Sequence, residues 1–201
     1  MLDHLDVALG SVRGTASGLS QAVRWSARET WHLTTAFYGE RPDAAVQGLG
    51  AELAEVAAAV EPYELVLRGA GVFSHRTLWV GVGGDVERQR ALTVGCVEAG
   101  DVADRRPRER AHLTVGRVRP GSRPPRRTSS TNEGRGARGA DPDGADVASG
   151  IVRALAVYEG PRWTVDELQL MSSQPGAGRG GGPLYEVIDR FALGSRGRME
   201  L

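Results

Sequence analysis

The chain has 201 residues, of which 40% are hydrophobic and 25% are charged, a balance typical of globular proteins that excludes a disordered, fibrous or membrane-spanning chain. A chain of this length buries roughly 70% of its unfolded surface, so we expect it to fold without a disulfide or a structural metal. All 25 basic residues are Arg, and they balance 25 acidic residues to give zero formal net charge. This average argues at first against a nucleic-acid partner, because phosphate binding normally requires a basic excess.

The charges are unevenly distributed along the chain. Residues 105–138 contain 11 Arg and 2 acidic residues, a formal charge of +9, and the rest of the chain carries −9. A segment this basic can steer an RNA backbone toward a nearby site. The alternative is a solvated tract that only follows the Arg-rich composition. The zero net charge therefore does not exclude RNA.

The N-terminal residues and the cysteine content indicate a soluble, cytoplasmic protein. The first residues are acidic and no apolar segment of signal-peptide length follows them, so we expect no secretory signal. Cys96 is the single cysteine, which excludes an internal disulfide and is typical of a small apolar core residue. No apolar run is long enough to span a membrane. The expected partners therefore exclude a membrane, and the expected state is a monomer.

The sequence predicts four helices, at residues 2–12, 41–60, 85–99 and 146–158. The second is the clearest, because its apolar residues form one stripe and a proline lies near its first turn. The last is predicted to begin at Asp146, since aspartate caps helix N-termini.

Seven further segments are predicted strands, because most are short, rich in β-branched or aromatic residues, and bounded by Gly or Pro. They lie near residues 22–26, 31–38, 63–68, 76–83, 110–119, 162–172 and 184–193. The mixture of helices and strands predicts an α/β or α+β fold in a single domain.

Two segments interrupt this pattern. Residues 120–145 contain almost no large apolar side chain and cannot offset the entropy of ordering by burial, so we expect a flexible Arg/Gly/Pro-rich insertion there. Residues 176–182 include five glycines and are expected to form a mobile connection between the last two strands. They match the G-x-G-x-x-G pattern of dinucleotide-binding folds, but that pattern requires a following helix, and a strand is predicted here.

Two of the four histidines share the same local sequence. The first motif is His32-Leu33-Thr34-Thr35, and the second is His112-Leu113-Thr114-Val115. Given the Leu and Thr content of the chain, chance would place Leu-Thr after two of four histidines with a probability of roughly 10⁻⁴. Coincidence is therefore a poor explanation of the repeat.

The repeat indicates acid–base chemistry on a phosphate. In a strand, residues i and i+2 share a face, so His32 and Thr34 should project together, as should His112 and Thr114. If the two halves pack with pseudo-two-fold symmetry, two imidazoles and two hydroxyls converge on one cleft. One imidazole can then accept a proton while the other donates one, and the hydroxyls can bind non-bridging phosphate oxygens.

A metal site is the main alternative for these histidines. Neither motif has a cysteine or carboxylate at ligand spacing, so the pair falls short of a three- or four-ligand set, and we expect neither a metal nor a cofactor. His4 and His75 have no partner motif and are interpreted as structural residues.

The paired motifs resemble the H-x-T-x motifs of the 2H phosphoesterase superfamily, specifically of the bacterial RNA 2′,3′-cyclic phosphodiesterases, also called LigT-like or 2′-5′ RNA ligase-like proteins. Further matching positions are Arg24-Trp25, Phe37 and Gly39, residues 163–170, residues 182–185 and residues 190–193. The resemblance covers most of the chain apart from 120–145.

The resemblance implies an α+β fold with two pseudo-symmetric lobes around a central cleft, and metal-independent hydrolysis of RNA 2′,3′-cyclic phosphate termini to 2′-phosphomonoesters. It implies that His32 is the proton donor, that His112 is the proton acceptor, and that Thr34 and Thr114 bind the phosphate. The residues alone leave open which histidine is the acid and which the base. The implied partners are RNA ends or cyclic nucleotides. The candidate substrate contacts are Phe37, Arg117 and Tyr185.

The start of the chain departs from the family pattern. The family usually opens with a short apolar strand, whereas this chain starts directly in Met1-Leu2-Asp3-His4-Leu5. We expect either that this first strand is missing or that the true start lies upstream. Two other functions also stay open, namely a nucleotide- or RNA-end-binding module without turnover and a 2′-5′ RNA ligase-type activity.

Overall fold

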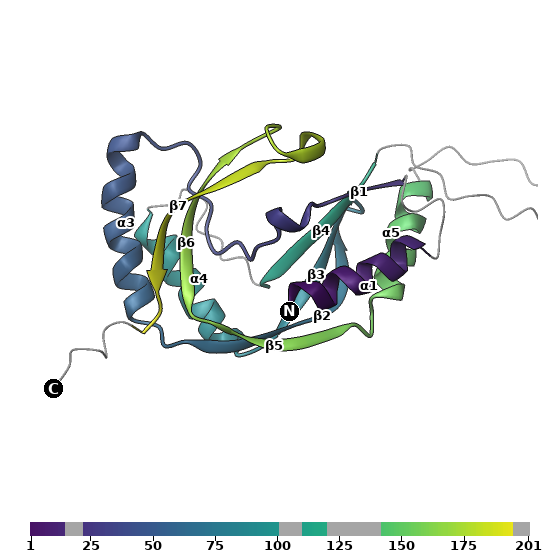
Figure 1. The fold of residues 1–201 in the computed structure, drawn as a ribbon, viewed down its shortest axis with the longest axis horizontal. Coiled ribbons are helices and arrows are strands. Elements are labelled where there is room, and N and C mark those ends of the chain that lie inside the picture. The colour runs from purple at the N-terminus through teal and green to yellow at the C-terminus, as the bar shows by residue number, and fades with distance from the viewer. Residues whose placement is uncertain (15–21, 101–109, 120–141, 195–201) are drawn as a thin grey trace, which may run out of the picture.

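The computed structural model describes residues 1–14, 22–100, 110–119 and 142–194, which form an α+β fold (Figure 1). Within these ranges the helices are α1 (Leu2–Gly14), α3 (Asp43–Ala58), α4 (Val86–Ala99) and α5 (Pro142–Ala154), and the 3₁₀ turns are η1 (Arg28–Thr30) and η2 (Arg179–Gly181). The strands are β1 (Val23–Trp25), β2 (Tyr63–Phe73), β3 (Thr77–Gly84), β4 (His112–Val118), β5 (Glu159–Val165), β6 (Glu167–Gln174) and β7 (Leu184–Ala192).

The helices follow the apolar spacing of the sequence. The predictions for 2–12, 41–60 and 85–99 are confirmed within a few residues by α1, α3 and α4. The prediction for 146–158 is wrong by four residues at each end, because α5 begins at Pro142, and Asp146 lies inside the helix instead of capping it. Proline suits a first helical position, where its missing N–H would have no acceptor. Among the described helices, none is long and apolar enough to cross a membrane.

The strands form two antiparallel sheets. One has five strands in the order β1-β4-β3-β2-β5, and the other consists of β6 and β7. In Figure 1, β2 and β5 run along the base of the molecule and join the side that carries α1 and α5 to the side that carries α3, α4, β6 and β7. His112 begins β4, an inner strand of the larger sheet, and the bridge between Leu33 and Leu113 brings the first motif beside it.

Two predicted strands are wrong in detail. Residues 31–38 do not form a strand and contain one isolated bridge, between Leu33 and Leu113. Residues 162–172 are divided between β5 and β6, which belong to different sheets. The chain changes sheet at Asp166, whose carbonyl oxygen accepts a hydrogen bond from the Leu193 N–H at 2.8 Å. The other strand predictions are confirmed, although β2 continues to Phe73.

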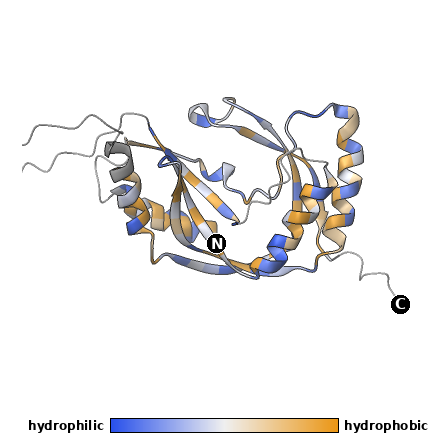
Figure 2. Cartoon of the chain, turned by 180° about the vertical axis from the view of Figure 1, so that it is seen from behind, coloured by the Kyte–Doolittle hydropathy of each residue, from blue (hydrophilic) through white to orange (hydrophobic). Residues whose placement is uncertain are grey.

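Two hydrophobic cores define two lobes. In the first lobe, α1 and α5 pack against β1, β3 and β4; in the second, α3 and α4 pack against the start of β2 and against β6 and β7. Figure 2 shows hydrophobic residues along α3, α4 and the strands of both sheets. Leu33, Val82 and Trp163 pack against both cores. The first histidine motif therefore lies where the two lobes meet.

The two segments predicted as loops have different outcomes. Residues 120–141 of the predicted insertion lie outside the described residues, and from Pro142 the chain is helical instead of a loop. Residues 176–182 connect β6 to β7, and a strand follows them, so the G-x-G-x-x-G match is not a dinucleotide-binding turn.

Candidate active site

The two motifs lie side by side at the antiparallel bridge between Leu33 and Leu113. In an antiparallel pairing the neighbours of a bridged pair face each other, so each histidine lies opposite the threonine of the other motif. Leu113 is buried and Leu33 packs against both cores, so the residues flanking them point to the other face. A local two-fold axis at the bridge thus relates the motifs. The cleft lining includes His32, Thr34, His112 and Thr114.

Both imidazoles are held in the same orientation. Nδ1 of His32 donates a hydrogen bond to the Thr30 carbonyl oxygen at 2.8 Å, and Nδ1 of His112 donates one to the Arg110 carbonyl oxygen at 3.0 Å. A carbonyl oxygen only accepts hydrogen bonds, so Nδ1 carries a proton in both rings. Nε2 is therefore the atom of each ring that is left to accept or donate a proton in the cleft.

Aromatic side chains pack edge-on against each imidazole. The Tyr185 ring on β7 lies 4.8 Å from the His32 ring, measured between centroids. The Phe73 ring lies 4.9 Å from the His112 ring and stacks on the Trp79 ring at 5.1 Å. Trp79 in turn covers Gly71 on the neighbouring strand, where an added Cβ would overlap the indole. These contacts restrict the rotation of both imidazoles.

The turn between β2 and β3 fixes the position of Phe73. Its central residues, Ser74 and His75, have φ values of 48° and 57°, and the Arg76 N–H donates to the Phe73 carbonyl oxygen at 2.9 Å. Positive φ at both central residues is the signature of a type I′ turn, whose twist matches that of a hairpin. The turn keeps Phe73 directly opposite Thr77, and both residues line the cleft.

A β-bulge turns Arg117 toward the face that carries His112 and Thr114. The register between β3 and β4 shifts by one residue, which leaves Val115 as an extra residue on β4. Val115 and Val118 are both buried in the first core, so Arg117 points away from that core. Gly116 lets β1 approach closely, because a Cβ there would lie 3.1 Å from a β1 carbonyl oxygen. The candidate contact Arg117 therefore shares a face with the second motif.

Arg117 lies directly opposite Arg24 on β1. Both side chains are exposed and line the cleft, and in the described ranges neither has a carboxylate within ion-pair distance. Phe37, another candidate contact, also lines the cleft and is 65% exposed. Sequence reasoning missed Arg24 as a cleft residue. The alternation of strand side chains was the available signal, because Val23 beside it faces the core.

Cys96 is a core residue, as predicted, and lies beneath the first motif. Burial raises the pKa of its thiol to about 11, and a hydrogen bond with the Thr35 side chain opposes this rise only in part. The Tyr38 hydroxyl donates to the Cys96 carbonyl oxygen at 2.7 Å, and burial raises the pKa of that hydroxyl as well. The thiol is therefore neutral near physiological pH and is a structural group.

The remaining histidines lie away from the motifs. Nδ1 of His4 is 3.3 Å from the Tyr158 hydroxyl, and His75 is exposed in the β2–β3 turn. Neither lines the cleft. Across the described residues, no group of three or more His, Cys, Asp or Glu side chains is arranged to hold a metal ion.

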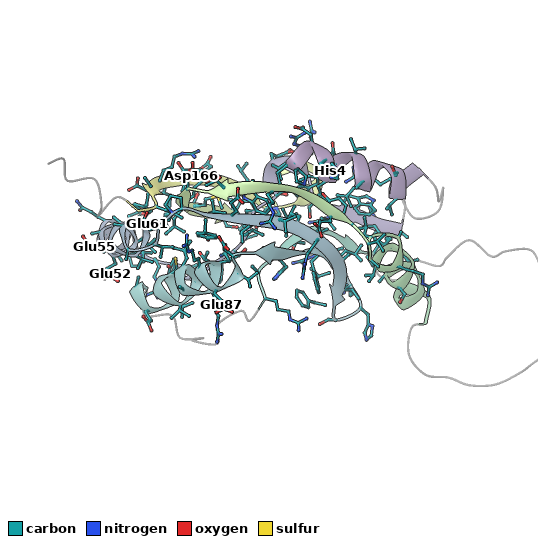
Figure 3. All side chains as sticks on the ribbon, turned by 90° about the horizontal axis from the view of Figure 1, so that it is seen from below. His4, Glu52, Glu55, Glu61, Glu87 and Asp166 are labelled. Carbon is teal, nitrogen blue, oxygen red and sulfur yellow. The ribbon has the colours of Figure 1, made fainter. Side chains whose placement is uncertain are left out.

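The described residues give the cleft lining an excess of positive charge. The described residues that line the cleft include seven arginines and four carboxylates. Other carboxylates gather on the second lobe and beside it (Figure 3). Those labelled in the figure are Glu52, Glu55, Glu61, Glu87 and Asp166. A cleft with an excess of positive charge attracts anions, and this excess lies on the face that carries the two histidines.

The first part of the chain matches a known family. Residues 9–79 match the family model described as LigT like Phosphoesterase. This range contains the first motif, all of β2 and the start of β3.

Two curated relatives carry the name RNA 2′,3′-cyclic phosphodiesterase. The protein from Geobacillus stearothermophilus is 33% identical over 124 residues, which are 58% of this chain and 39% of that protein. The protein from Methanothermobacter thermautotrophicus is 29% identical over 115 residues, which are 54% of this chain and 61% of that protein. The chain thus matches less than two thirds of the length of either relative.

The fold is similar to that of a solved structure. The crystal structure of E. coli LigT complexed with 3′-AMP superposes with a TM-score of 0.61 at 19% sequence identity, and the match covers 96% of this chain and 92% of that one. At this identity the similarity shows a common fold.

Proposed function

We propose that the chain is a LigT-like phosphoesterase of the 2H superfamily and that it hydrolyses 2′,3′-cyclic phosphate termini of RNA to 2′-phosphomonoesters without a metal ion. The observation that carries the proposal is the bridge between Leu33 and Leu113, since it brings both motif histidines and both threonines to one face of the cleft, with each Nδ1 engaged by a carbonyl oxygen. The names of the two relatives support the same activity.

In the proposed reaction the two histidines move one proton each. Nε2 of His112 accepts a proton from water while the water oxygen bonds to phosphorus, and Nε2 of His32 donates a proton to the departing 3′ oxygen. The bond between phosphorus and the 3′ oxygen breaks, and the phosphate stays on the 2′ oxygen. The local two-fold axis treats the two rings alike, so the assignment of donor and acceptor rests on the resemblance of the motifs. Each Nδ1 hydrogen bond keeps the tautomer that this proton transfer requires.

We assign the two threonines to phosphate binding. The hydroxyls of Thr34 and Thr114 line the cleft and can donate hydrogen bonds to non-bridging phosphate oxygens. Donors placed at oxygens that gain charge stabilise the transition state more than the ground state. Because each threonine lies opposite the histidine of the other motif, the phosphate would be held across the bridge by both motifs together.

Two rings are assigned to the terminal nucleoside. Phe37 and Tyr185 both line the cleft, and an aromatic ring can stack on any base. We also propose that the site belongs to one bilobal domain, because Leu33, Val82 and Trp163 pack against both cores.

The test is a product assay on an oligonucleotide that ends in a 2′,3′-cyclic phosphate, with and without EDTA. We expect a 2′-phosphate product, a bell-shaped pH profile, and activity that survives EDTA. His32→Ala and His112→Ala should each lower kcat by about 10²–10⁴-fold while the folded state persists. His4→Ala, a change on the exposed face of α1, is the matched control and should keep full activity.

Each result decides between the open functions. Full activity in either motif variant would contradict the mechanism, and loss of activity in EDTA would contradict metal independence. Tight binding of cyclic phosphate ends without any product would favour a binding module. Longer products joined through 2′-5′ linkages would show ligase-type activity.

A further inference from the structure

We propose that the second lobe contains a docking site for a β-strand, which binds an extended segment of a different polypeptide with apolar residues at alternate positions. The site lies between residues 33–38 and residues 168–173 of β6, and both segments line the same cavity. We call it the strand slot. The inference concerns a peptide partner and goes beyond the proposed hydrolysis.

Residues 33–38 form one edge of the strand slot. They contact β4 through a single bridge, between Leu33 and Leu113. Beyond this bridge, the backbone N–H and C=O groups of Thr35, Ala36 and Phe37 make no hydrogen bond with any described residue. Thr35 and Ala36 are half-buried, and backbone groups withdrawn from water normally have a partner. This edge therefore has backbone groups available to a neighbouring strand.

Residues 168–173 of β6 form the opposite edge. β6 pairs with β7 on one side, and these two strands make up the whole of their sheet in the described part of the chain. In Figure 1, β7 and the segment that leads from η1 to α3 lie on opposite sides of β6. The free edge of β6 thus faces the strand slot, and a free strand edge is a template for pairing with another chain.

The floor of the strand slot is apolar. Side chains from two helices line the cavity between the edges, and they are Val46, Leu49 and Leu53 from α3 and Cys96 from α4. All four belong to the second core or pack against it, as do Leu168 and Leu170 of β6. Successive side chains of a strand point to opposite faces, so every second side chain of a bound segment would rest on this floor. The floor therefore favours apolar residues at alternate positions.

The two edges identify the occupant as a strand. A helix uses its backbone hydrogen bonds internally and would leave both edges without partners. An extended segment presents backbone groups on both sides, at a spacing of about 4.7–4.9 Å from each neighbour. Residues 33–38 and 168–173 are six residues each, so a segment of about six residues, roughly 20 Å long, fits between them. Peptides that add a strand in this way gain affinity from the backbone and specificity from alternate side chains.

The test measures binding of labelled synthetic peptides by fluorescence anisotropy. Three capped seven-residue peptides carry Thr or Arg at odd positions and Val, Leu or Phe at all even positions. At least one should bind saturably to the full chain, and hydrogen exchange should then slow at the amides of residues 35–37 and 168–173. N-methylation of two adjacent central residues removes one donor to each edge and keeps every side chain, so it should weaken binding by about tenfold.

Substitutions at Val46 test the floor. Val46 is half-buried near the start of α3, and Val46→Asp places a charge under the bound segment, so the affinity for the peptide should fall by at least about tenfold. Val46→Leu keeps the floor apolar and should retain binding. Val157→Asp is the matched control, because Val157 is 93% exposed and lies outside the cavity lining. It should bind the peptide like wild type.

Three results would overturn the strand slot. They are absence of binding by all three peptides, equal affinity for the N-methylated peptide, and slowed exchange elsewhere than at the two edges. A dimer of this chain that the peptide dissociates would assign the site to a second copy and would contradict the inference of a different polypeptide. The binding assay requires no turnover, so a failure of the proposed hydrolysis would leave its result unchanged.

Discussion

Gly71→Ala should destabilise the protein and impair His112 through a chain of three rings. The ideal Cβ of an alanine at this position would lie 2.6 Å from Cε2 of Trp79 and would overlap other atoms of the same indole. The ring must therefore move, since real Cβ atoms do not approach so closely. Trp79 stacks on Phe73, and both rings flank the His112 imidazole, so the displacement reaches His112.

The expected losses of stability and of kcat follow from the overpacking at Gly71. Forcing one methyl group into a filled site costs about 1–3 kcal/mol. For a protein of this size, about 2 kcal/mol lowers Tm by about 4–8 °C. A catalytic group displaced by about 1 Å can lose 10²-fold in rate, so kcat should fall by about 10–100-fold.

The same substitution at Gly48 provides the control. Gly48 lies in α3, and an added Cβ there meets nothing within 4 Å. Gly48→Ala should therefore stabilise the helix by about 0.5–1 kcal/mol and leave kcat unchanged. Thermal melts and cyclic phosphate hydrolysis measure both effects. If Gly71→Ala melted at the wild-type temperature with wild-type kcat, the packing of Trp79 on Gly71 would be refuted as a support of the site.

Four further predictions concern the site and its surroundings. The kcat of the double variant His32→Ala/His112→Ala should be no lower than that of the less active single variant, because the two groups act as one unit. Single-turnover assays measure this. Leu113→Ala should cost about 2–5 kcal/mol in urea denaturation, since it empties a buried position under both motifs. Arg24→Gln should stabilise the free protein by about 0.2–1 kcal/mol at low salt, by relief of like-charge repulsion, and the gain should vanish at high salt. Burial raises the pKa of Cys96 from 9.0 to about 11. The stability contributed by its neutral thiol is therefore complete below pH 9 and is lost as the pH rises through 11. Urea denaturation should show that the free energy of unfolding of wild type exceeds that of Cys96→Ala by less at about pH 10.5 than at about pH 8.

Hydrophobic spacing predicted the helices and most strands because burial on one face imposes a period. The errors occur where that period slips by one residue. Trp163 and Val165 are half-buried at the end of β5, whereas Leu168 and Leu170 are the buried residues of β6. The inward side changes from odd to even positions at Asp166, where the chain changes sheet. A slip of this kind is visible in the sequence, and a prediction that followed the parity would have divided the strand.

The repeat predicted that the two motif histidines and the two motif threonines line one cleft, because two copies of one motif in a chain indicate a shared site. It did not predict the aromatic rings around His112 or the pairing of Arg24 with Arg117. Phe73 and Arg24 carry no motif in the sequence that links them to the histidines. Their positions depend on the register of β1 and β2 against strands far away in the chain. Register of that kind is set by packing of the whole sheet and not by local spacing.

The extra residue in β4 separates the second motif from Arg117, so the orientation of Arg117 can change while the motif stays in place. The motif residues of β4 lie before Val115 and Arg117 lies after it, so a deletion of one residue at this point would leave the histidines in place and exchange the inward and outward sides of the strand end. Arg117 would then face the core, and Val118 would face the groove. The number of residues in β4 thus decides which side chains after the bulge line the cleft, without any substitution in either motif.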